Sequence, residues 1–362
     1  MKRIPRLFLF AIAVMLVSCG GVGSSSGSTS SASEPTLLQK ANLGIVKLQT
    51  WYTESSGLYQ TTGWWNAANS ITVLLDYSHL SGSSQYLPTV ANTFKVNSGG
   101  GFLNDYYDDE GWWALAWIAA YDQTGNPSYL SMAEQIFSNM TTGWDNTCGG
   151  GIWWSKKRQY KNAIANELFL SVAAKLAGRT TGSEQTSYLN WAEKEWTWFS
   201  GSGMINFQHL INDGLDSSCQ NNGKTVWSYN QGVILGGLTA LAKDTSNNSL
   251  LQPAQSIAQA AISHLTDANG ILHDACEPNC GADGTQFKGI FVRNLATLNA
   301  AAPQQQYVTF LQTNADSVWQ NDRSPDYEFG LIWSGPYSSG NAATQTSAID
   351  CLLAADEATT KQ

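Results

Sequence analysis

The chain has 362 residues, a length that fits one large domain or two ordinary ones, and its 28 acidic and 19 basic residues give a formal net charge of −9. Only 13% of the residues are charged and no basic run occurs, so the composition excludes binding to the phosphate backbone of nucleic acid. Fifteen tryptophans, together with many amide and hydroxyl side chains, favour a neutral glycan as the ligand.

The N-terminus has the pattern of an export signal. Lys2, Arg3 and Arg6 precede an apolar run over residues 7–17, which is too short to span a bilayer as a helix. The run ends in Leu-Val-Ser-Cys at Cys19, which resembles a bacterial lipobox. We therefore expect a lipoprotein signal over 1–18 and lipidation of Cys19, so that the membrane is reached only through the lipid. A plain cleavable signal with an incidental cysteine is the alternative.

The next stretch, 19–36, is rich in glycine and serine, which make up almost all of 20–33, and is predicted to be a flexible tether. From residue 37 to the C-terminus, apolar spacing and helix breakers predict about twelve helices, with hardly any strand-like alternation. The expected helices cover 37–54, 64–80, 84–96, 110–123, 127–140, 161–178, 184–199, 228–243, 249–265, 286–300, 303–320 and 341–356.

Two kinds of helix alternate in this series. One kind follows a polar turn and opens with Tyr-Leu or Leu-Leu, whereas the other opens with aromatic or small polar residues and is rich in alanine and glycine. This alternation predicts an all-α fold in which six helical hairpins close into an (α/α)6 barrel over 37–362. An open solenoid of hairpins is the alternative, but it would need polar capping repeats.

Five long loops join an outer helix to the next inner helix, so we expect them all on one face of the barrel. The first leads into Asp108, Asp109 and Glu110 at the start of a helix. A carboxylate pair walled by aromatic rings can protonate and attack a glycosidic bond. The alternative is that these acids only complement the positive end of the helix. Other acids could substitute for the pair or orient hydroxyl groups: Asp105, Glu110, Asp213, Asp216 and Asp326.

The same loops repeat an aromatic residue beside an amide or a charge, which suits a groove for sugar rings and hydroxyls. A single tryptophan at a helix start more often packs in the core, but fifteen of them around one predicted face favour a groove. The candidate substrate-binding residues are Trp64, Trp65, Asn104, Asp105, Tyr107, Trp112, Trp153, Trp154, Asp213, Trp227, Tyr229, Asn230, Gln231, Phe287, Lys288 and Arg293.

If Cys19 carries lipid, five cysteines remain, enough for two disulfides and one thiol. Cys148, Cys219, Cys276 and Cys280 lie in loops and are the candidates for disulfides, and Cys351 lies in an apolar helical pattern. A zinc site is the competing interpretation, but the four histidines lack ligand spacing with the cysteines. Because there is also no GxGxxG entering a helix and no Walker loop, we expect no metal and no cofactor.

Several motifs in collinear order resemble glycoside hydrolase family 76. They are Tyr-Tyr-Asp-Asp-Glu-Gly-Trp-Trp ending at Trp113, Cys-Gly-Gly-Gly-Ile-Trp-Trp from Cys148, the helix start Lys161-Asn162-Ala163, Tyr-Asn-Gln-Gly from Tyr229, and Phe-Lys-Gly-Ile-Phe-Val-Arg-Asn from Phe287. The resemblance implies an (α/α)6 fold and endo-acting, retaining hydrolysis of α-1,6-mannosidic linkages. It implies that Asp108 is the nucleophile and Asp109 the acid/base.

A retaining mechanism needs two carboxyl groups about 5 to 5.5 Å apart. Two close carboxylates repel, so one pKa rises, and we expect the raised one to be that of Asp109. The partner is then a polysaccharide or oligosaccharide, and we expect a monomer. Two alternatives stay open: hydrolysis of another α-linked mannoside or glycan, and a non-catalytic, cell-surface glycan-binding lipoprotein.

Overall fold

The structure is a computed structural model that describes residues 34–360. The expected signal peptide 1–18, Cys19 and most of the expected tether 19–36 lie outside the described residues. Within 34–360, no helix is both long and apolar enough to cross a membrane.

Twelve α-helices make up the described part of the chain. They are α1 Leu37–Gln49, α2 Trp64–Ser81, α3 Leu87–Asn97, α4 Tyr107–Thr124, α5 Pro127–Thr141, α6 Ala163–Ala177, α7 Gly182–Gly201, α8 Ser228–Thr245, α9 Leu251–His264, α10 Phe287–Ala301, α11 Gln305–Asn321 and α12 Ala342–Thr360. Two short strands, β1 Tyr52–Thr53 and β2 Leu58–Tyr59, pair antiparallel between α1 and α2. Four 3-10 turns lie in the connections: η1 Ser98–Gly100, η2 Thr147–Gly149, η3 Asn248–Leu250 and η4 Gly284–Gln286.

Local sequence signals set many of the helix ends. Thr36 and the side chain of Gln39 form a capping box at the start of α1. The first turn of α5 contains Pro127, whose missing N–H costs nothing there. At the end of α4, Gly125 has a φ of 70°, a left-handed conformation that glycine adopts without strain.

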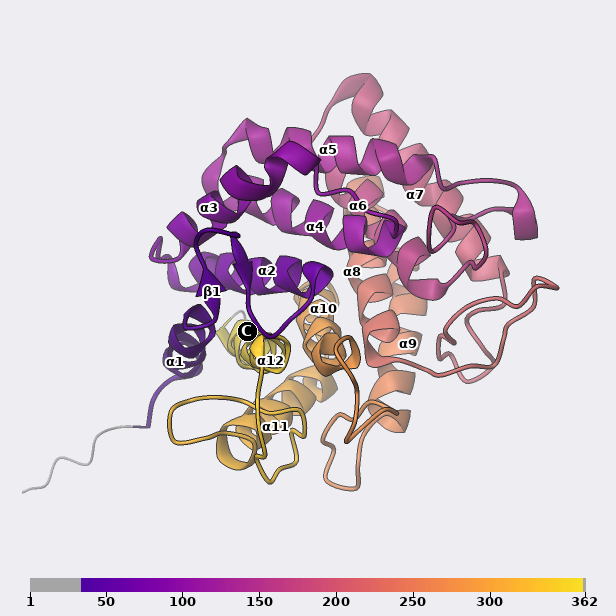
Figure 1. The fold of residues 1–362 in the computed structure, drawn as a ribbon. Coiled ribbons are helices and arrows are strands. Elements are labelled where there is room, and N and C mark those ends of the chain that lie inside the picture. Colours follow the sequence, from indigo (N-terminus) through magenta and orange to yellow (C-terminus); the bar gives the residue numbers. More distant parts are fainter. Residues whose placement is uncertain (1–33, 361–362) are drawn as a thin grey trace, which may run out of the picture. The chain divides into compact units, whose positions relative to one another are not determined.

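The six even-numbered helices form a closed inner ring. Each packs against the next in the series α2, α4, α6, α8, α10 and α12, and α12 packs against α2. The odd-numbered helices lie outside this ring (Figure 1). The described domain is therefore the predicted (α/α)6 barrel, and the open solenoid is wrong because the last inner helix meets the first.

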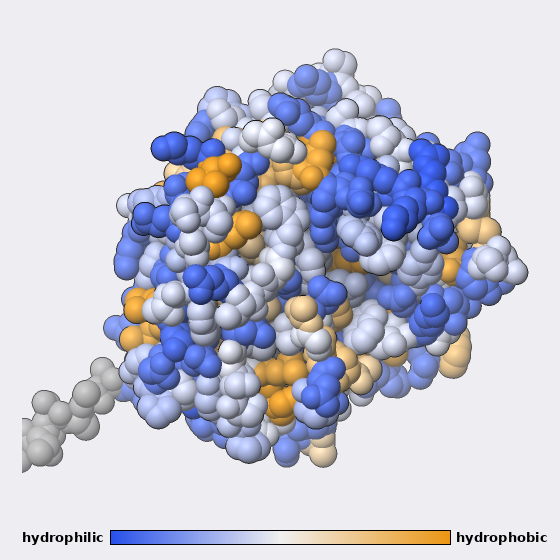
Figure 2. All heavy atoms as spheres, in the orientation of Figure 1, coloured by the Kyte–Doolittle hydropathy of each residue, from blue (hydrophilic) through white to orange (hydrophobic). Residues whose placement is uncertain are grey.

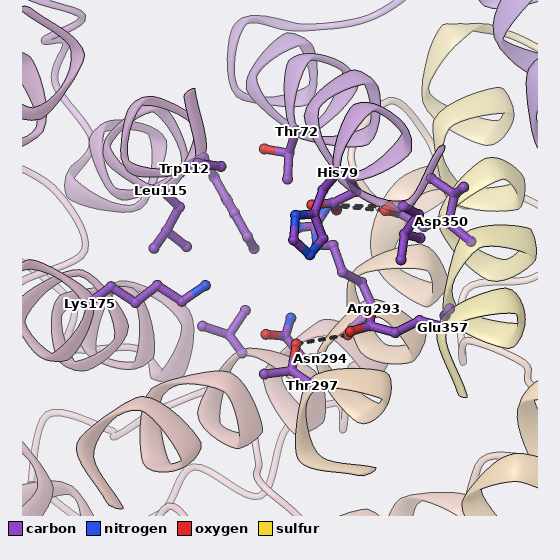
Figure 3. A pocket seen from close by; sticks show the side chains of 16 residues that line it. Thr72, His79, Trp112, Leu115, Lys175, Arg293, Asn294, Thr297, Asp350 and Glu357 are labelled. Atoms are coloured by element: carbon purple, nitrogen blue, oxygen red, sulfur yellow. Dashed lines mark hydrogen bonds and ion pairs between the residues drawn. The ribbon is translucent and has the colours of Figure 1, made fainter. Parts of the chain in front are cut away.

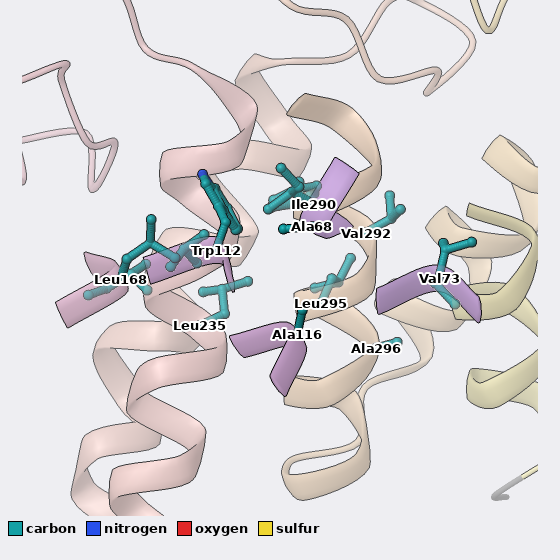
Figure 4. Close-up of a cluster of buried hydrophobic side chains, with 14 of the residues drawn as sticks. Ala68, Val73, Trp112, Ala116, Leu168, Leu235, Ile290, Val292, Leu295 and Ala296 are labelled. Atoms are coloured by element: carbon teal, nitrogen blue, oxygen red, sulfur yellow. The ribbon is translucent and has the colours of Figure 1, made fainter. Parts of the chain in front are cut away.

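Small residues allow the inner helices to approach closely. A Cβ on Gly232 of α8 would lie 2.6 Å from the Cα of Phe291 in α10, and a Cβ on Gly289 would lie 2.5 Å from the Cα of Ser347 in α12. Larger apolar side chains fill the remaining space, among them Trp112, Leu168 and Leu235 (Figure 4). Dense packing of this kind leaves little room for volume changes in the inner ring.

The long loops between outer and inner helices are held by amide side chains. Asn166 of α6 accepts from the backbone N–H of Ile152 at 2.7 Å and donates to its carbonyl at 3.0 Å. Gln231 of α8 does the same for Ile211, at 2.8 and 2.9 Å. The loops therefore have fixed positions at the N-terminal ends of the inner helices. Hydrophilic and neutral residues cover most of the face seen in Figure 2, and hydrophobic residues form small separate patches on it.

Candidate active site

Asp108 and Asp109 lie in the first turn of α4, where the α3–α4 loop enters the helix. The neighbouring α5–α6 loop fixes this junction, because the N–H of Tyr107 donates to the carbonyl of Trp154 at 2.9 Å. The same loop places the indole of Trp154 against the first acid, and its Nε1 donates to Asp108 Oδ2 at 2.9 Å. The other oxygen of Asp108, Oδ1, is buried and has no hydrogen-bond partner among the described residues.

Asp109 is held from the opposite side by the loop that precedes it. Asn104 donates from Nδ2 to Asp109 Oδ2 at 2.5 Å and accepts from the N–H of Tyr106 at 2.8 Å. Asn104 is therefore a positioning residue for Asp109 and does not itself line the cleft.

Glu110, the third acid of the run, points away from the other two. It is fully buried, forms an ion pair with Lys156 Nζ at 2.9 Å and accepts from Asn139 Nδ2 at 2.6 Å. These bonds tie α4 to α5 and to the α5–α6 loop. Glu110 thus has a structural role, whereas Asp108 and Asp109 line the cleft, and Glu110 is not a substitute for either aspartate.

A cleft of ≈ 450 Å³ opens in front of Asp108 and Asp109. This volume is within the range of small-molecule sites, and the cleft draws its residues from four helices and four loops. The described residues that line it are Trp65, Tyr106, Asp108, Asp109, Trp112, Trp154, Tyr160, Asn162, Asp213, Tyr229, Asp283 and Phe287.

Aromatic rings from four inner helices form a continuous surface in this cleft. Trp65 of α2 stacks on Trp112 of α4 with ring centroids 5.6 Å apart, and Tyr229 of α8 stacks on Phe287 of α10 at 3.8 Å. Trp112 and Tyr229 join the two pairs at 6.5 Å. Such a surface offers ring faces to the apolar faces of sugars.

The ionisable side chains that line the cleft are all acids or tyrosines. Asp213 accepts from the hydroxyl of Tyr160 and from Trp227 Nε1, and Asp283 accepts from Trp65 Nε1 at 2.9 Å. No lysine, arginine or histidine is among the described residues that line this cleft. Four carboxylates without a cation disfavour anionic ligands and suit the hydroxyl groups of a neutral glycan.

Both carboxyl groups of the pair have raised pKa values. Burial, followed by the charge of Asp109, holds the pKa of Asp108 well above its usual range. Burial raises the pKa of Asp109 to about 6, against the opposing hydrogen bond from Asn104. The sequence predicted the raised pKa at Asp109 alone. The structure differs because Asp108 is more deeply enclosed and has an unpartnered oxygen, whereas Asn104 stabilises the charged form of Asp109.

Several predicted binding residues lie next to the cleft without lining it. Trp64 packs against Phe102 and Trp113, and Tyr107 is buried with its hydroxyl 3.2 Å from Thr142 Oγ1. Gln231 holds the α7–α8 loop, which carries Asp213. Asp105 is exposed and Asn230 is buried. The indole of Trp153 donates to Asp145, and the indole of Trp227 donates to Asp213.

Lys288 and Arg293 lie elsewhere, which corrects their assignment to the groove. Helical geometry is the reason: Lys288 is rotated by about 100° from Phe287, and Arg293 lies about 9 Å further along α10. Lys288 forms an ion pair with Glu277 at 2.5 Å.

Arg293 reaches a separate cavity between the inner helices, where it faces Asp350 of α12 (Figure 3). That cavity also holds Asp76, His79 and Lys175, and Trp112 forms a wall of both cavities.

The other candidate acids have structural partners. Asp216 caps a turn by accepting from the N–H groups of Ser218 and Gln220. Asp326 forms an ion pair with Lys47 at 2.7 Å. Neither lines the cleft.

Four lining residues were not among the predicted binding residues: Tyr106, Tyr160, Asn162 and Asp283. Tyr106 and Asn162 belong to motifs that the sequence already displayed. Tyr160 is an aromatic residue directly before the predicted helix 161–178. An aromatic residue at a helix start was also the signal that indicated Trp227 and Tyr229. Asp283 has no local signal, since only the folding of the α9–α10 loop brings it to Trp65.

The cysteines form two disulfides, Cys148–Cys219 and Cys276–Cys280, and Cys351 is a buried thiol. The pairing leaves no thiolate in the loops for a zinc ion. Among residues 34–360, no group of three or more histidines, cysteines and acids is arranged to hold a metal.

A closed barrel of six helical hairpins, with an adjacent carboxylate pair in an aromatic cleft at one end, defines a glycoside hydrolase of the six-hairpin class. Residues 38–362 match glycosyl hydrolase family 76. The chain therefore belongs to this family.

Two fungal mannan endo-1,6-alpha-mannosidases are similar to this chain. Mannan endo-1,6-alpha-mannosidase DCW1 of Candida albicans is 30% identical over 278 residues, which are 68% of this chain and 60% of the relative. Mannan endo-1,6-alpha-mannosidase DFG5 of Saccharomyces cerevisiae is 27% identical over 346 residues, 85% of this chain and 74% of the relative. The chain thus spans less than two thirds of the Candida relative.

Solved structures share the fold. An inactive variant of the alpha-1,6-mannanase GH76A of Salegentibacter sp. HEL1_6, with two consecutive aspartates replaced by alanine and in complex with alpha-1,6-mannotetrose, has a TM-score of 0.80 at 22% identity over 89% of this chain and 99% of that one. The Lin0763 protein of Listeria innocua has a TM-score of 0.79 at 25% identity, over 89% and 97% of the two chains.

Proposed function

We propose that this protein is an endo-α-1,6-mannanase that cleaves mannan-type polysaccharides with retention of configuration. The observation that carries the proposal is the pair Asp108 and Asp109 at the base of an aromatic cleft without cationic side chains. Family membership and the names of the relatives support the α-1,6-mannosidic linkage as the target.

In the first step, Asp108 attacks the anomeric carbon while Asp109 protonates the glycosidic oxygen, and the leaving sugar departs with a free hydroxyl group. Trp154 Nε1 donates to Asp108 Oδ2 and orients the carboxyl group, whereas Oδ1 has no hydrogen-bond partner among the described residues. Asn104 likewise holds Oδ2 of Asp109, so Oδ1 of Asp109 carries the proton.

In the second step, Asp109 takes a proton from a water molecule whose oxygen bonds to the anomeric carbon, while the bond from that carbon to Asp108 breaks and Asp108 leaves as a carboxylate. Two inversions at the same carbon retain its configuration. In the empty cleft the higher pKa lies on Asp108. The positive charge that develops at the anomeric carbon favours the ionised form of Asp108, so substrate places the shared proton on Asp109.

The test is incubation of the purified protein with linear α-1,6-mannan, with linear β-mannan as the control. We expect a series of oligosaccharides from α-1,6-mannan whose newly formed ends are initially α-anomers by NMR. Mannose as the sole early product would refute endo action, and β-anomers would refute retention. An intact α-1,6-mannan would refute the substrate.

We also propose that the protein is exported, anchored at the cell surface through lipid on Cys19, and active as a monomer. The proposal rests on the lipobox-like sequence and on a cleft whose lining residues all come from one chain. Labelled palmitate should enter the wild type and not a Cys19→Ala variant, and sedimentation of the soluble barrel should give a single-chain mass. Equal labelling of both proteins would refute the anchor.

A further inference from the structure

A second hollow adjoins the catalytic cleft. Its volume, ≈ 430 Å³, is close to that of the cleft, and its walls come from the α5–α6 and α7–α8 loops. Tyr160 lines both spaces, so its side chain forms the boundary between them. A glycan that leaves the cleft past Tyr160 enters this hollow.

Tyr160 is held firmly in that position. Its hydroxyl donates to Asp213 on the cleft side and accepts from Asn222 Nδ2 at 2.8 Å on the side of the hollow. The edge of its ring meets Trp154 at a centroid distance of 6.4 Å. A ring fixed at its polar end can serve as a stacking surface for a sugar without further loss of side-chain entropy.

The outer wall of the hollow is cross-linked. The disulfide Cys148–Cys219 joins the two loops across 71 residues of sequence and lines the hollow itself. Trp198 Nε1 donates to the carbonyl of Cys148 at 2.9 Å and pins this wall to α7. Lys161 Nζ, which is buried, donates to the carbonyls of Thr147, Gly150 and Gly151 at 2.7, 2.6 and 2.9 Å.

The hollow contains unused polar groups beside aromatic ones. Gln159 and Ser217 are exposed, and their side chains make no hydrogen bond to other residues of the described chain. Lys224 Nζ lies 5.6 Å from the ring centroid of Tyr160, and Trp153 lines the same space. Amide, hydroxyl and ammonium groups around two rings form a suitable environment for a neutral pyranose.

We propose that this hollow is a distal subsite, which binds a hexopyranose unit of the same glycan beyond the units held in the catalytic cleft. The disulfide Cys148–Cys219 keeps its two walls at the spacing that the sugar requires. The proposal rests on the proposed endo-α-1,6-mannanase function, because the sugar must belong to a chain that is already bound in the cleft.

The test compares kcat/KM on α-1,6-linked manno-oligosaccharides of increasing length. In the wild type we expect kcat/KM to rise about tenfold at the length that first reaches the hollow, which is the effect of about one stacking contact with its hydrogen bonds. Ser217→Leu fills the hollow with an aliphatic group and should remove this rise, with shorter substrates unaffected. Ser218→Leu is the matched control, since Ser218 is the exposed neighbour outside the hollow, and it should behave as wild type.

Two further variants keep the test independent of any single substitution. Gln159→Ala should reduce the rise, and the double variant Cys148→Ser/Cys219→Ser should remove it while cleavage of the shortest substrates continues. An unchanged length profile in Ser217→Leu, or a wild type without any rise, would overturn the subsite but leave the mannanase function intact. A wild type that cleaves no α-1,6-linked substrate would overturn both.

Discussion

Asparagine in place of Asp108 is expected to lower kcat on α-1,6-mannan about 10⁴-fold, because an amide cannot form the covalent bond to the anomeric carbon. Asparagine has nearly the shape of aspartate, and its side-chain oxygen can still accept from Trp154 Nε1. The melting temperature and the binding of manno-oligosaccharide should therefore change little. Reducing-end release measures the rate, and calorimetry measures the binding.

Asp109→Asn should cost about 10²- to 10⁴-fold, the range for loss of a general acid/base. The two roles differ in chemical rescue. In Asp109→Ala, azide should restore the second step, because it attacks the glycosyl intermediate without a general base. A substrate whose leaving group needs no protonation should be cleaved faster than the natural glycan by the same variant. Rescue of Asp108→Ala with retained configuration, and none of Asp109→Ala, would mean that the roles are reversed.

The pH profile offers a second test of the pair. The active pair carries one proton in total, with Asp108 ionised and Asp109 protonated. Because the pKa of Asp108 lies well above its usual range, the pair keeps this proton above pH 6, so kcat/KM should fall only at more alkaline pH. It should rise as the pH rises through about 6, the pKa of Asp109, where the doubly protonated pair loses its first proton. The charge of Asp283 contributes to raising this pKa. Asp283→Asn should therefore move the acid limb to lower pH, and a limb that stays in place would contradict this electrostatic coupling.

The second large effect concerns stability and the cavity that contains Arg293. Arg293 Nη1 lies 3.2 Å from Asp350 Oδ1, and its Nη2 donates to Asn69 Oδ1 at 2.7 Å. The carboxyl group of Asp350 is only 1% exposed. Removing the guanidinium leaves this carboxylate buried without a counter-charge, so Arg293→Met should lower the free energy of unfolding by about 3 to 5 kcal/mol at pH 8.

The loss should depend on pH. Burial raises the pKa of Asp350 to about 7 in the folded state, from 3.8 for the ordinary carboxyl. The folded state therefore binds a proton more tightly than the unfolded state, and the contribution of this group to stability falls as the pH rises from about 4 to about 7. Without Arg293 the pKa rises further, so the variant should lose about 1 kcal/mol more at pH 8 than at pH 5, which is the free energy of the one pH unit between this pKa and pH 8.

Urea unfolding at pH 5 and pH 8 measures this difference. Arg179→Met is the matched control, because the ion pair of Arg179 with Asp122 is partly exposed and should be worth no more than about 1 kcal/mol. The double variant Arg293→Met/Asp350→Asn should recover stability at pH 8. Equal losses at both pH values would show that Arg293 acts through packing and not through the charge of Asp350.

The sequence alone determined most of the barrel and the place of the two candidate acids, Asp108 and Asp109, in it. Helix number, helix ends and the alternation of inner and outer helices follow from local spacing, caps and breakers, which act within a few residues. The position of Asp108 and Asp109 at a loop-to-helix junction is local for the same reason. Eight of the twelve lining residues were predicted, the two acids among them. Five of the eight are aromatic, because aromatic residues in the loops and at helix starts mark the end of the barrel where the loops meet.

Only the tertiary structure decided which side chains share the cleft. Asp283 reaches Trp65 from a loop 218 residues away in sequence, and no local pattern encodes such a contact. Lys288 belongs to the same motif as Phe287, but one helical step turns it away from the cleft. The higher pKa of Asp108 likewise depends on how deeply the assembled barrel encloses it. Spacing along the chain sets the elements, whereas burial and charge at the site arise from contacts between residues that are distant in sequence.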